Sequence, residues 1–370
     1  MRVFLSTGEA SGELLATDLL GAMRARGETI EAEGIGDARM EQADVVLWHR
    51  TRGWASLGPL EALGKIPRLL AIMWGTALRL RRQPPDLIVL VDFGAFNVRL
   101  ARTVRRLGAR VPILYYFPPA AWLDNARRAR AVAQTCDVLT AFVHQRDFYR
   151  SLGLPVGYVG HPLASTIAPR ATRPAPPPDG GTIALLPGSR RAEIDRHTPR
   201  LLDALALVRL VRPNIQATLV AIDDDAQKMF EHWLALRSPQ PVTIVRNARA
   251  ALTTVDVAAI ASGTAVLEAA LVETPALALY VLSNAQAKIA RRVYTGKYIT
   301  LPNLVTDEPI VPELFQEAAT PDALAAALLR LLAAPQRQLA GYARMRAALG
   351  APDALDRCAA FALDLARGKA

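Results

Sequence analysis

The 370-residue sequence has only two cysteines, Cys136 and Cys358, and they lie far apart in the chain. It contains no Cys-x-x-Cys pair and no Cys/His cluster, so neither a disulfide framework nor a structural zinc site is indicated. No uncharged apolar run reaches the roughly 18 residues of a membrane-spanning helix. The N-terminal stretch MRVFLSTGEA leads directly into a predicted strand and lacks the apolar core of a signal peptide. We therefore expect a cytoplasmic protein in a reducing compartment.

Two common nucleotide-binding fingerprints are also missing. The loop STGEASGEL (residues 6–14) follows the first predicted strand, but it is not G-x-G-x-x-G and lacks the lysine of a P-loop. Gly8 and Gly12 permit a tight turn there, and Glu9 presents a carboxylate at the end of the strand. An ordinary capped turn is the alternative. The five histidines are scattered, so we predict no metal site and no cofactor.

The charge and composition favour a packed protein with anionic partners. Hydrophobic residues make up 51% of the chain, charged residues 21%, and the net charge is +10. This composition is typical of globular domains rather than of disordered chains. The positive charge favours nucleic acid, acidic lipid surfaces or phosphorylated substrates, although surface arginines that serve solubility are the alternative.

The order of the predicted elements indicates two α/β domains. Apolar runs such as RVFLS (residues 2–6) and DLIVLVDF (86–93) alternate with helical segments, and continuous apolar strands are typical of a parallel sheet buried on both faces. The alternation starts again at TIALLPGSR (182–190). We therefore predict an α/β fold in which two Rossmann-like, doubly wound parallel-sheet domains face a cleft.

Composition places the boundaries between these domains. The stretch PRATRPAPPPDGG, residues 169–181, is rich in proline and ends in two glycines, which is typical of a hinge linker. It separates an N-terminal domain, residues 1–168, from a C-terminal domain, residues 182–350. A last helix is predicted within residues 351–370.

The stretch LLPGSRRAEI, residues 185–194, has the strongest local signal for an anion site. An apolar strand ends at Pro187, Gly188 and Ser189 and a helical segment follows, which is how a strand delivers an anion to the amides of a helix N-terminus. Arg190 adds a guanidinium that can bind two phosphate oxygens. A capped turn with exposed arginines is the alternative.

The stretch IASGTAVLEAAL, residues 260–271, repeats this arrangement about one sheet position away. Ser262, Gly263 and Thr264 form a small polar turn before a helix, and Glu268 lies one helical turn beyond Thr264. A carboxylate at that place can accept hydrogen bonds from both hydroxyls of a ribose, while an N-capped helix with an exposed glutamate is the alternative. In LPNLV, Asn303 is either a sugar or phosphate contact or a turn residue.

An apolar segment in the first half, residues 54–83, combines large hydrophobic side chains with a basic end. Pro59 and Pro67 are predicted to break it, so it is too short and too interrupted to span a membrane. The surface formed by residues 57–73 can dip into a membrane, with Arg68 and its basic neighbours against anionic headgroups. A core helix with a basic face is the alternative.

Taken together, these motifs resemble the lipid-A-disaccharide synthase family of glycosyltransferases, essentially from end to end. The stretches GEASGE, GIGDARM and LGPLEALGKIPRLL are similar to that family's opening loop, glycine-rich segment and apolar insertion. GHPL, LLPGSRRAEI, ASGTAVLEAAL and YITLPNL follow in the family's order. These last four motifs are specific as a set.

The resemblance implies a GT-B fold and transfer of 2,3-diacylglucosamine from its UDP derivative to 2,3-diacylglucosamine 1-phosphate. The products would be a β-1,6-linked disaccharide 1-phosphate and UDP, formed with inversion and without a metal. In this fold the C-terminal half binds the nucleotide. The implied donor-side residues are Gly188, Ser189 and Arg190 for the diphosphate, Ser262, Gly263 and Thr264 for the adjacent phosphate or sugar, Glu268 for the ribose, and Asn303 near the donor.

The resemblance also implies where the protein works and what it meets. Its partners would be the UDP-diacylglucosamine donor, the acylated glucosamine phosphate acceptor and the surface of the inner membrane, which it would contact peripherally from the cytoplasmic side. Nucleic acid is not implied, and a homodimer is left open. The last helix, residues 351–370, would pack back on the N-terminal domain, as it does in many GT-B chains.

The first half departs from the family pattern where a catalytic base is expected. The family's DxPDFN segment reads DFGAFN, so Asp92 is present but Ala95 stands at the second acidic position. The family's SPSxWAW segment reads PPAAWLD and introduces Asp124. Glu9, Asp92 and Asp124 are therefore the candidate bases for the acceptor hydroxyl.

Three interpretations follow from these departures. The chain is a divergent lipid-A-disaccharide synthase, a related GT-B transferase that uses a UDP-sugar with another acceptor, or a non-catalytic paralogue. The first is favoured. The donor half keeps the family motifs better than the acceptor half does.

Overall fold

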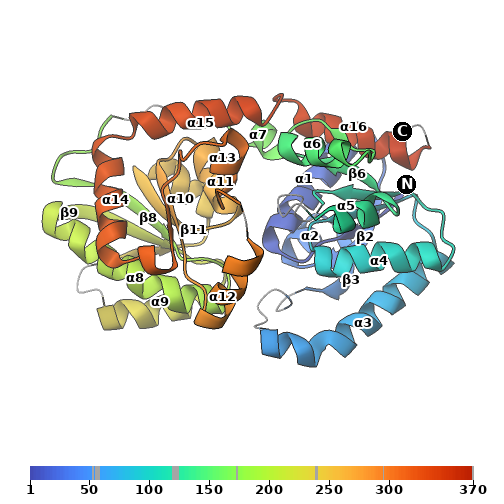
Figure 1. Ribbon diagram of the computed structural model, residues 1–370, viewed down its shortest axis with the longest axis horizontal. Helices are drawn as coiled ribbons and strands as arrows, with labels where there is room; N and C mark the ends of the chain where they lie inside the picture. The colour runs from blue at the N-terminus through green and yellow to red at the C-terminus, as the bar shows by residue number, and fades with distance from the viewer. Residues whose placement is uncertain are drawn as a thin grey trace. The chain divides into compact units, whose positions relative to one another are not determined.

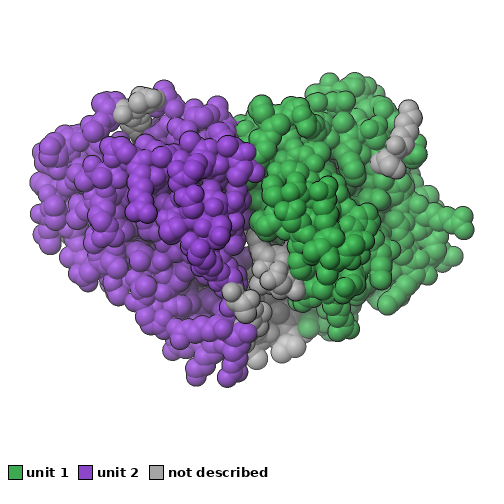
Figure 2. Space-filling model, turned by 45° about the horizontal axis from the view of Figure 1, so that its top comes forward, with its two compact units in different colours: residues 1–166, 349–370 green, residues 167–348 purple. Residues whose placement is uncertain are grey.

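The computed structural model describes residues 1–51, 54, 59–118, 125–171, 174–237, 241–294 and 296–368, without the side chains of residues 59–65, 289 and 293. The chain forms two compact units (Figure 2). Unit 1 comprises Met1–Thr166 together with Leu349–Ala370, and unit 2 comprises Ile167–Ala348. The C-terminal segment therefore belongs to the same unit as the N-terminus.

Unit 1 is built on a seven-stranded parallel sheet (Figure 1). The strand order is β3-β2-β1-β4-β5-β6-β7. Every residue of β4 is buried, as its continuous apolar sequence LIVLV predicts for a central strand covered on both faces. The strands are β1 (Arg2–Ser6), β2 (Glu31–Gly36), β3 (Val45–Arg50), β4 (Leu87–Val91), β5 (Ile113–Tyr116), β6 (Asp137–Thr140) and β7 (Gly157–Tyr158).

The C-terminal helix of unit 1 packs against its first helix. Arg26, at the end of α1, forms an ion pair of 2.6 Å with Asp356 of α16, and the Leu355 amide donates to the Ser165 hydroxyl at 3.2 Å. The helices of this unit are α1 (Ala10–Ala25), α2 (Ala38–Gln42), α3 (Pro59–Arg82), α4 (Gly94–Arg106), α5 (Ala126–Ala133), α6 (Val143–Ser151), α7 (Pro162–Thr166) and α16 (Ala354–Ala366).

Unit 2 repeats the architecture with a six-stranded parallel sheet in the order β10-β9-β8-β11-β12-β13. The strands are β8 (Gly180–Leu186), β9 (Asn214–Val220), β10 (Thr243–Val245), β11 (Val257–Ala261), β12 (Ala276–Tyr280) and β13 (Glu313–Phe315). The helices are α8 (Arg191–Val211), α9 (Asp224–Arg237), α10 (Ala248–Thr254), α11 (Thr264–Leu271), α12 (Asn284–Val293), α13 (Leu301–Thr306), α14 (Pro321–Ala333) and α15 (Gln336–Ala348). The predicted α/β class, with doubly wound parallel sheets, is thus confirmed.

Each sheet contains one point at which the strand order reverses. In unit 1 it lies between β1 and β4, where Ser6 pairs with Leu90, and in unit 2 between β8 and β11, where Leu186 pairs with Ile260. At such a point the loops that leave neighbouring strands run in opposite directions and open a crevice at the carboxyl edge, where ligands of open α/β sheets bind.

Two features of the fold differ from the predictions. Helix α3 runs unbroken through Pro67, where a break was predicted. Strand β3, with the sequence VVLWHR, was not predicted. Among the described residues, no helix is long and apolar enough to cross a membrane.

Candidate functional site

Two of the predicted ligand loops lie side by side in unit 2. The β8–α8 turn (Pro187 to Arg190) and the β11–α11 turn (Ser262 to Thr264) follow strands that pair directly, with Leu186 opposite Ile260. Both turns therefore leave the carboxyl edge at the reversal point of the sheet. The sequence prediction that these turns are neighbours is confirmed.

The β8–α8 turn is folded around the carboxylate of Glu193. Gly188 has a φ of +118°, and a Cβ atom on it would lie 2.4 Å from Glu193 Oε2, so the position requires glycine. Glu193 Oε2 accepts hydrogen bonds from the amides of Ser189 (3.1 Å) and Arg190 (3.3 Å), and Arg190 Nη1 donates to Oε1 at 3.1 Å. The donors that the sequence assigns to an external anion thus hold an internal one.

Glu193 was missed at the sequence level, although a signal for it was present. A glutamate three residues after the N-cap position is the spacing of a capping box, and Arg190 is the N-cap residue of α8. Its further partner could not be read from the sequence. The Tyr280 hydroxyl, at the end of β12, donates to Glu193 Oε1 at 2.8 Å. Burial and the neighbouring Glu193 carboxylate raise the pKa of Tyr280 to about 12, so the phenol stays protonated.

A buried histidine ties the same turn to β12. His197 Nδ1 lies 2.6 Å from the Pro187 carbonyl oxygen, and the Val281 amide donates to Nε2 at 2.9 Å. An imidazole with one donating and one accepting nitrogen is neutral, and burial lowers the pKa of His197 accordingly. The ring therefore fixes the turn in place and does not act as a cation.

The β11–α11 turn is open by comparison. Gly263 is exposed, is the N-cap residue of α11, and has no side-chain cap for the first amides of the helix. Its φ of 167° is extended backbone, and a Cβ atom there would meet nothing closer than the Ala261 carbonyl oxygen at 3.9 Å. An uncapped helix N-terminus with space in front of it can accept an anion.

Glu268 lies on α11 beside a cation. Its Oε2 is 3.2 Å from Nε of Arg249 on α10, and 16% of its side chain is exposed. The carboxylate is thus held in one orientation by a partner that the sequence analysis did not identify. Its second oxygen carries the acceptor capacity that a sugar hydroxyl would use.

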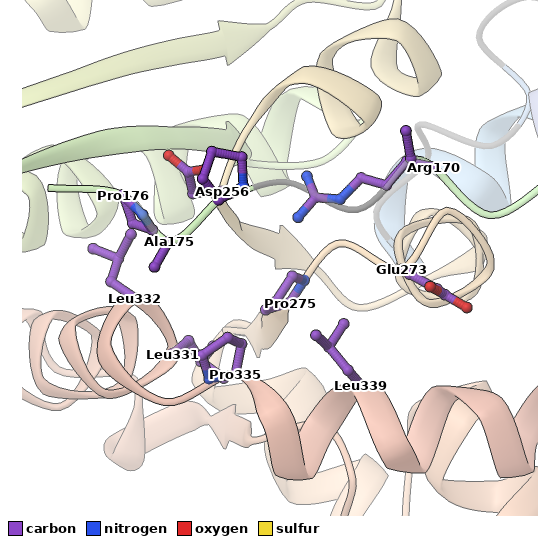
Figure 3. A pocket seen from close by; sticks show the side chains of 12 residues that line it. Arg170, Ala175, Pro176, Asp256, Glu273, Pro275, Leu331, Leu332, Pro335 and Leu339 are labelled. Carbon is purple, nitrogen blue, oxygen red and sulfur yellow. The ribbon is translucent and has the colours of Figure 1, made fainter.

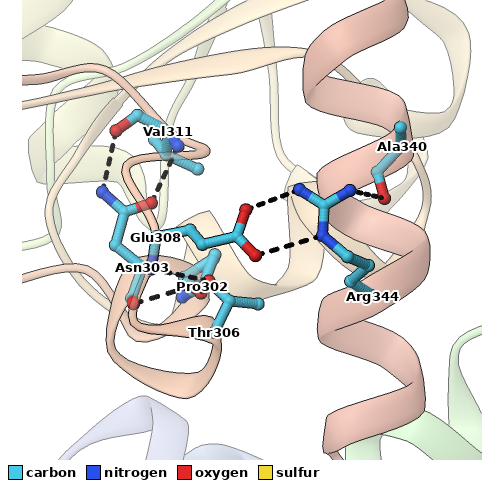
Figure 4. Close-up of polar contacts among 7 residues, drawn as sticks. All are labelled: Pro302, Asn303, Thr306, Glu308, Val311, Ala340 and Arg344. Carbon is cyan, nitrogen blue, oxygen red and sulfur yellow. Dashed lines mark hydrogen bonds and ion pairs between the residues drawn. The ribbon is translucent and has the colours of Figure 1, made fainter.

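Asn303 is buried within unit 2 and bonded to the protein itself (Figure 4). Its Nδ2 donates to the Val311 carbonyl at 2.9 Å and to Glu313 Oε1 at 3.0 Å, and its Oδ1 accepts from the Val311 amide at 2.8 Å. Glu313 also accepts from the Thr300 amide and hydroxyl, at 2.8 and 2.7 Å. With only 1% of Asn303 exposed, these contacts make it a support of the α13 region.

The reversal point of unit 1 carries Glu9 and Asp92, both exposed. Asp92 and Phe93 have consecutive φ values of 44° and 46°, a left-handed conformation that is costly for residues other than glycine. The Asp92 carbonyl is held there by the Tyr115 hydroxyl at 2.7 Å and by Asn97 Nδ2 at 3.1 Å. Strain maintained in this way is concentrated at functional sites.

An aromatic cluster of Trp54, Phe93 and Phe96 includes the residue that follows Asp92 in the chain. The centroid of Phe96 is 5.5 Å from those of both Trp54 and Phe93. The Phe93 ring sits directly on Gly8, because a Cβ atom at Gly8 would be 2.2 Å from Phe93 Cγ. The third candidate base, Asp124, lies outside the described residues.

His161 of the GHPL motif is enclosed by other side chains of unit 1. It is buried between Phe117 and Phe142, with centroid distances of 5.1 and 5.0 Å, and its Nδ1 accepts from the Leu163 amide at 3.2 Å. Burial lowers its pKa to about 3. The ring is therefore uncharged at neutral pH.

A cavity of about 150 Å³ in unit 2 lies apart from the two ligand turns (Figure 3). Asp256 and Pro275, which line it, precede β11 and β12, so it opens at the amino edge of the sheet. Arg170 and Pro176 of the predicted hinge stretch form part of its wall. Among the described residues, no group of three or more His, Cys, Asp or Glu is placed to hold a metal ion.

Comparison with solved structures shows the fold that these sheets form. The UDP-GlcNAc 2-epimerase of Neisseria meningitidis, solved bound to UDP-GlcNAc, superimposes with a TM-score of 0.65 at 12% identity, covering 98% of this chain and all of that one. A UDP-forming α,α-trehalose-phosphate synthase from Burkholderia xenovorans gives a TM-score of 0.54 at 14% identity, covering 99% and 98%. The two Rossmann-like sheets and the likeness to these solved structures identify the fold as GT-B.

Sequence comparison gives a closer relationship. The family model of lipid-A-disaccharide synthetase matches residues 3–350. The lipid-A-disaccharide synthase of Pseudomonas aeruginosa (strain UCBPP-PA14) is 36% identical over 340 residues, covering 90% of this chain and 89% of that protein. The enzyme of the same name from Syntrophus aciditrophicus (strain SB) is 32% identical over 374 residues, covering 98% and 97%. The chain therefore belongs to the lipid-A-disaccharide synthase family, the glycosyltransferases that form the disaccharide of lipid A.

Proposed function

We propose that the protein transfers 2,3-diacylglucosamine from its UDP derivative to 2,3-diacylglucosamine 1-phosphate. The 6-hydroxyl oxygen of the acceptor attacks the anomeric carbon of the donor, the bond from that carbon to the UDP oxygen breaks, and the hydroxyl proton passes to a carboxylate base. Attack opposite the leaving group inverts the anomeric centre and gives the β-1,6 linkage. Cationic and amide donors stabilise the departing UDP without a metal.

The donor belongs to the reversal point of unit 2 in this proposal. The observation that carries it is the direct pairing of β8 with β11, which sets Arg190 and the uncapped N-terminus of α11 at one edge. A guanidinium and helix amides are the groups that bind a diphosphate. Gly188 and Ser189 shape the turn, Ser262, Gly263 and Thr264 meet a phosphate or the sugar, and Glu268 accepts from the ribose. Asn303 is buried and supports this region through its hydrogen bonds to Val311 and Glu313.

The catalytic base belongs to the reversal point of unit 1. We favour Asp92, because its strained backbone is held by Tyr115 and Asn97, and strain of this kind persists where function requires it. Glu9 leaves the neighbouring strand and is the second candidate, with Asp124 the third. In this proposal Asp92 or Glu9 takes the catalytic role of the acidic residue that the family has at the position of Ala95.

We further propose that α3 binds the inner face of the inner membrane peripherally. Ile66, Leu70, Trp74 and Leu78 recur every four residues, with exposed fractions of 43%, 41%, 52% and 36%, so they form an apolar stripe along one face of the helix. A second face, with Met73, Ala77 and Leu80, is buried in the core. Exposed arginines on α3, including Arg68, Arg81 and Arg82, would meet anionic headgroups.

The extent of the stripe refines the predicted membrane surface of residues 57–73, since Trp74 and Leu78 lie beyond it. Trp74→Ser combined with Leu78→Ser is expected to lower co-sedimentation with phosphatidylglycerol-containing liposomes by at least about tenfold, because two large apolar side chains would be lost from the contact. Leu210→Ser in unit 2, where the side chain is 81% exposed, is the matched control. Unchanged liposome binding of the double variant would contradict the membrane role of α3.

The reaction itself is tested by incubating the protein with UDP-2,3-diacylglucosamine and 2,3-diacylglucosamine 1-phosphate and measuring the disaccharide 1-phosphate by mass spectrometry. Calorimetric UDP binding without product would favour a different acceptor. No UDP binding would favour a non-catalytic paralogue. A homodimer, which the proposal leaves open, is measured separately by light scattering after size-exclusion chromatography.

A further inference from the structure

We propose that Glu193 is a positioning residue of the donor site, which acts by holding Arg190 against Tyr280 and by reserving the amides of the β8–α8 turn for itself. The donor diphosphate is then bound by the guanidinium of Arg190 and the open N-terminus of α11, and not by the backbone of the PGSR turn. This inference rests on the proposed function, because it assumes that a UDP-sugar binds at the reversal point of unit 2.

The first step of the argument is the saturation of the β8–α8 turn. Glu193 Oε2 takes the amides of Ser189 and Arg190, and Glu193 Oε1 takes Arg190 Nη1 and the Tyr280 hydroxyl. Only 12% of the Glu193 side chain is exposed. A phosphate oxygen cannot occupy the same place, because the carboxylate lies directly over Gly188.

The second step is that these contacts join separate elements of unit 2. Tyr280 lies at the end of β12, while Glu193 and His197 lie on α8, which follows β8. His197 links Pro187 to Val281, so a second connection joins the same two strand ends. Two independent connections from the β8–α8 segment to the end of β12 leave the turn and Arg190 little freedom to rearrange when a ligand arrives.

The third step is the exposure of the groups that a ligand can reach. A guanidinium has five N–H donors, and 38% of the Arg190 side chain is exposed. The adjacent α11 N-terminus has no side-chain cap, and Gly263 has open space in front of it. These two groups can bind a diphosphate while Glu193 keeps its place. Glu193 then orients the cation, as a carboxylate orients an arginine in many anion sites.

A competing mechanism makes the opposite prediction. If the diphosphate displaced Glu193 from the turn, the carboxylate would be an intramolecular competitor of UDP. Removal of its charge would then strengthen UDP binding, whereas loss of a positioning residue weakens it. The sign of the effect of Glu193→Gln therefore decides between the two mechanisms.

The experiment measures the Kd of UDP by calorimetry and the KM of both substrates. We expect Glu193→Gln to weaken UDP binding by about tenfold, because the charge that holds Arg190 is lost, and Tyr280→Phe by about threefold, because Glu193 then loses one donor but keeps its bonds to Arg190. The KM of the donor rises in both variants while the KM of the acceptor stays unchanged. Glu308→Gln is the matched control, since Glu308 pairs with Arg344 at 2.6 Å in the same unit (Figure 4) and its loss should leave UDP binding unchanged.

A double-mutant cycle with Arg190→Ala shows whether Glu193 acts through Arg190. In that background Glu193→Gln is expected to lose most of its effect. Tighter UDP binding in Glu193→Gln, or an undiminished effect without Arg190, would overturn the proposal. Tyr280→Phe keeps the test decisive if Glu193→Gln does not fold. Failure of the donor-site proposal itself is recognised separately, because UDP binding would then be unchanged in Arg190→Ala.

Discussion

The two sheets reverse their strand order in the same way, yet the loops at the two reversal points are built differently. In unit 2 the turn after β8 is filled by Glu193 and the turn after β11 is open. In unit 1 the turn after β4 is strained at Asp92 and Phe93, and the ring of Phe93 covers Gly8. The comparison teaches that the topology supplies the position of a site, while a few side chains decide which groups are left for a ligand.

The largest expected effect concerns the base at the reversal point of unit 1. Asp92→Asn keeps the side-chain shape but removes the proton acceptor, so we expect kcat to fall about 10²–10⁴-fold with little change in UDP affinity. Glu9→Gln is measured in parallel as the neighbouring carboxylate. If both variants retain the wild-type rate of disaccharide formation, the base lies at neither position.

The glycines of the two reversal points should respond differently to alanine. Gly8→Ala places a methyl group within the Phe93 ring, and we expect it to lower the free energy of unfolding by about 1–3 kcal/mol. Gly263→Ala meets open space in extended backbone and is expected to cost under about 1 kcal/mol. Denaturant titration measures both. Phe93→Ala should restore part of the stability of Gly8→Ala, and no rescue would show that the ring is not the obstacle.

A smaller effect separates the amide from the hydroxyl at the start of α11. Proline is tolerated at the first position of a helix but lacks an N–H, so Thr264→Pro should weaken UDP binding by about five- to tenfold, the contribution of one hydrogen bond to an anion. Thr264→Ala keeps the amide and serves as the control. Equal calorimetric affinities of the two variants would place the diphosphate elsewhere.

The last effect is a pH dependence of stability in unit 1. The pKa of His161 is about 3 in the folded protein and near 6.5 when exposed, so the unfolded chain binds the proton first as the pH falls. Stability should therefore decrease from pH 6.5 towards pH 3, by up to about 1.4 kcal/mol per pH unit from this residue. His161→Phe should show a shallower dependence of its unfolding midpoint over pH 4–6.5. An identical slope in the variant would mean that His161 does not contribute.

Much of the fold and part of the site could be predicted from the sequence. The apolar strands of LIVLV type, and the glycine turns that follow β8 and β11, are local patterns, and both were found where expected. Helix α3 continues through Pro67, although the proline predicted a break, because Met73, Ala77 and Leu80 beyond it are packed into the core of unit 1. Tertiary burial outweighs local helix propensity in such a case.

The sequence by itself determined the family, the α/β class and the loops that carry polar chemistry, because these depend on residue order over short stretches. Only the tertiary structure decided which of the predicted groups are committed within the protein. Glu193 meets Tyr280, Glu268 meets Arg249, and Asn303 meets Val311 and Glu313 across separate elements. Such pairs form because parallel strands bring distant segments of the chain to one edge, and hydrogen bonds made there leave fewer donors for a ligand.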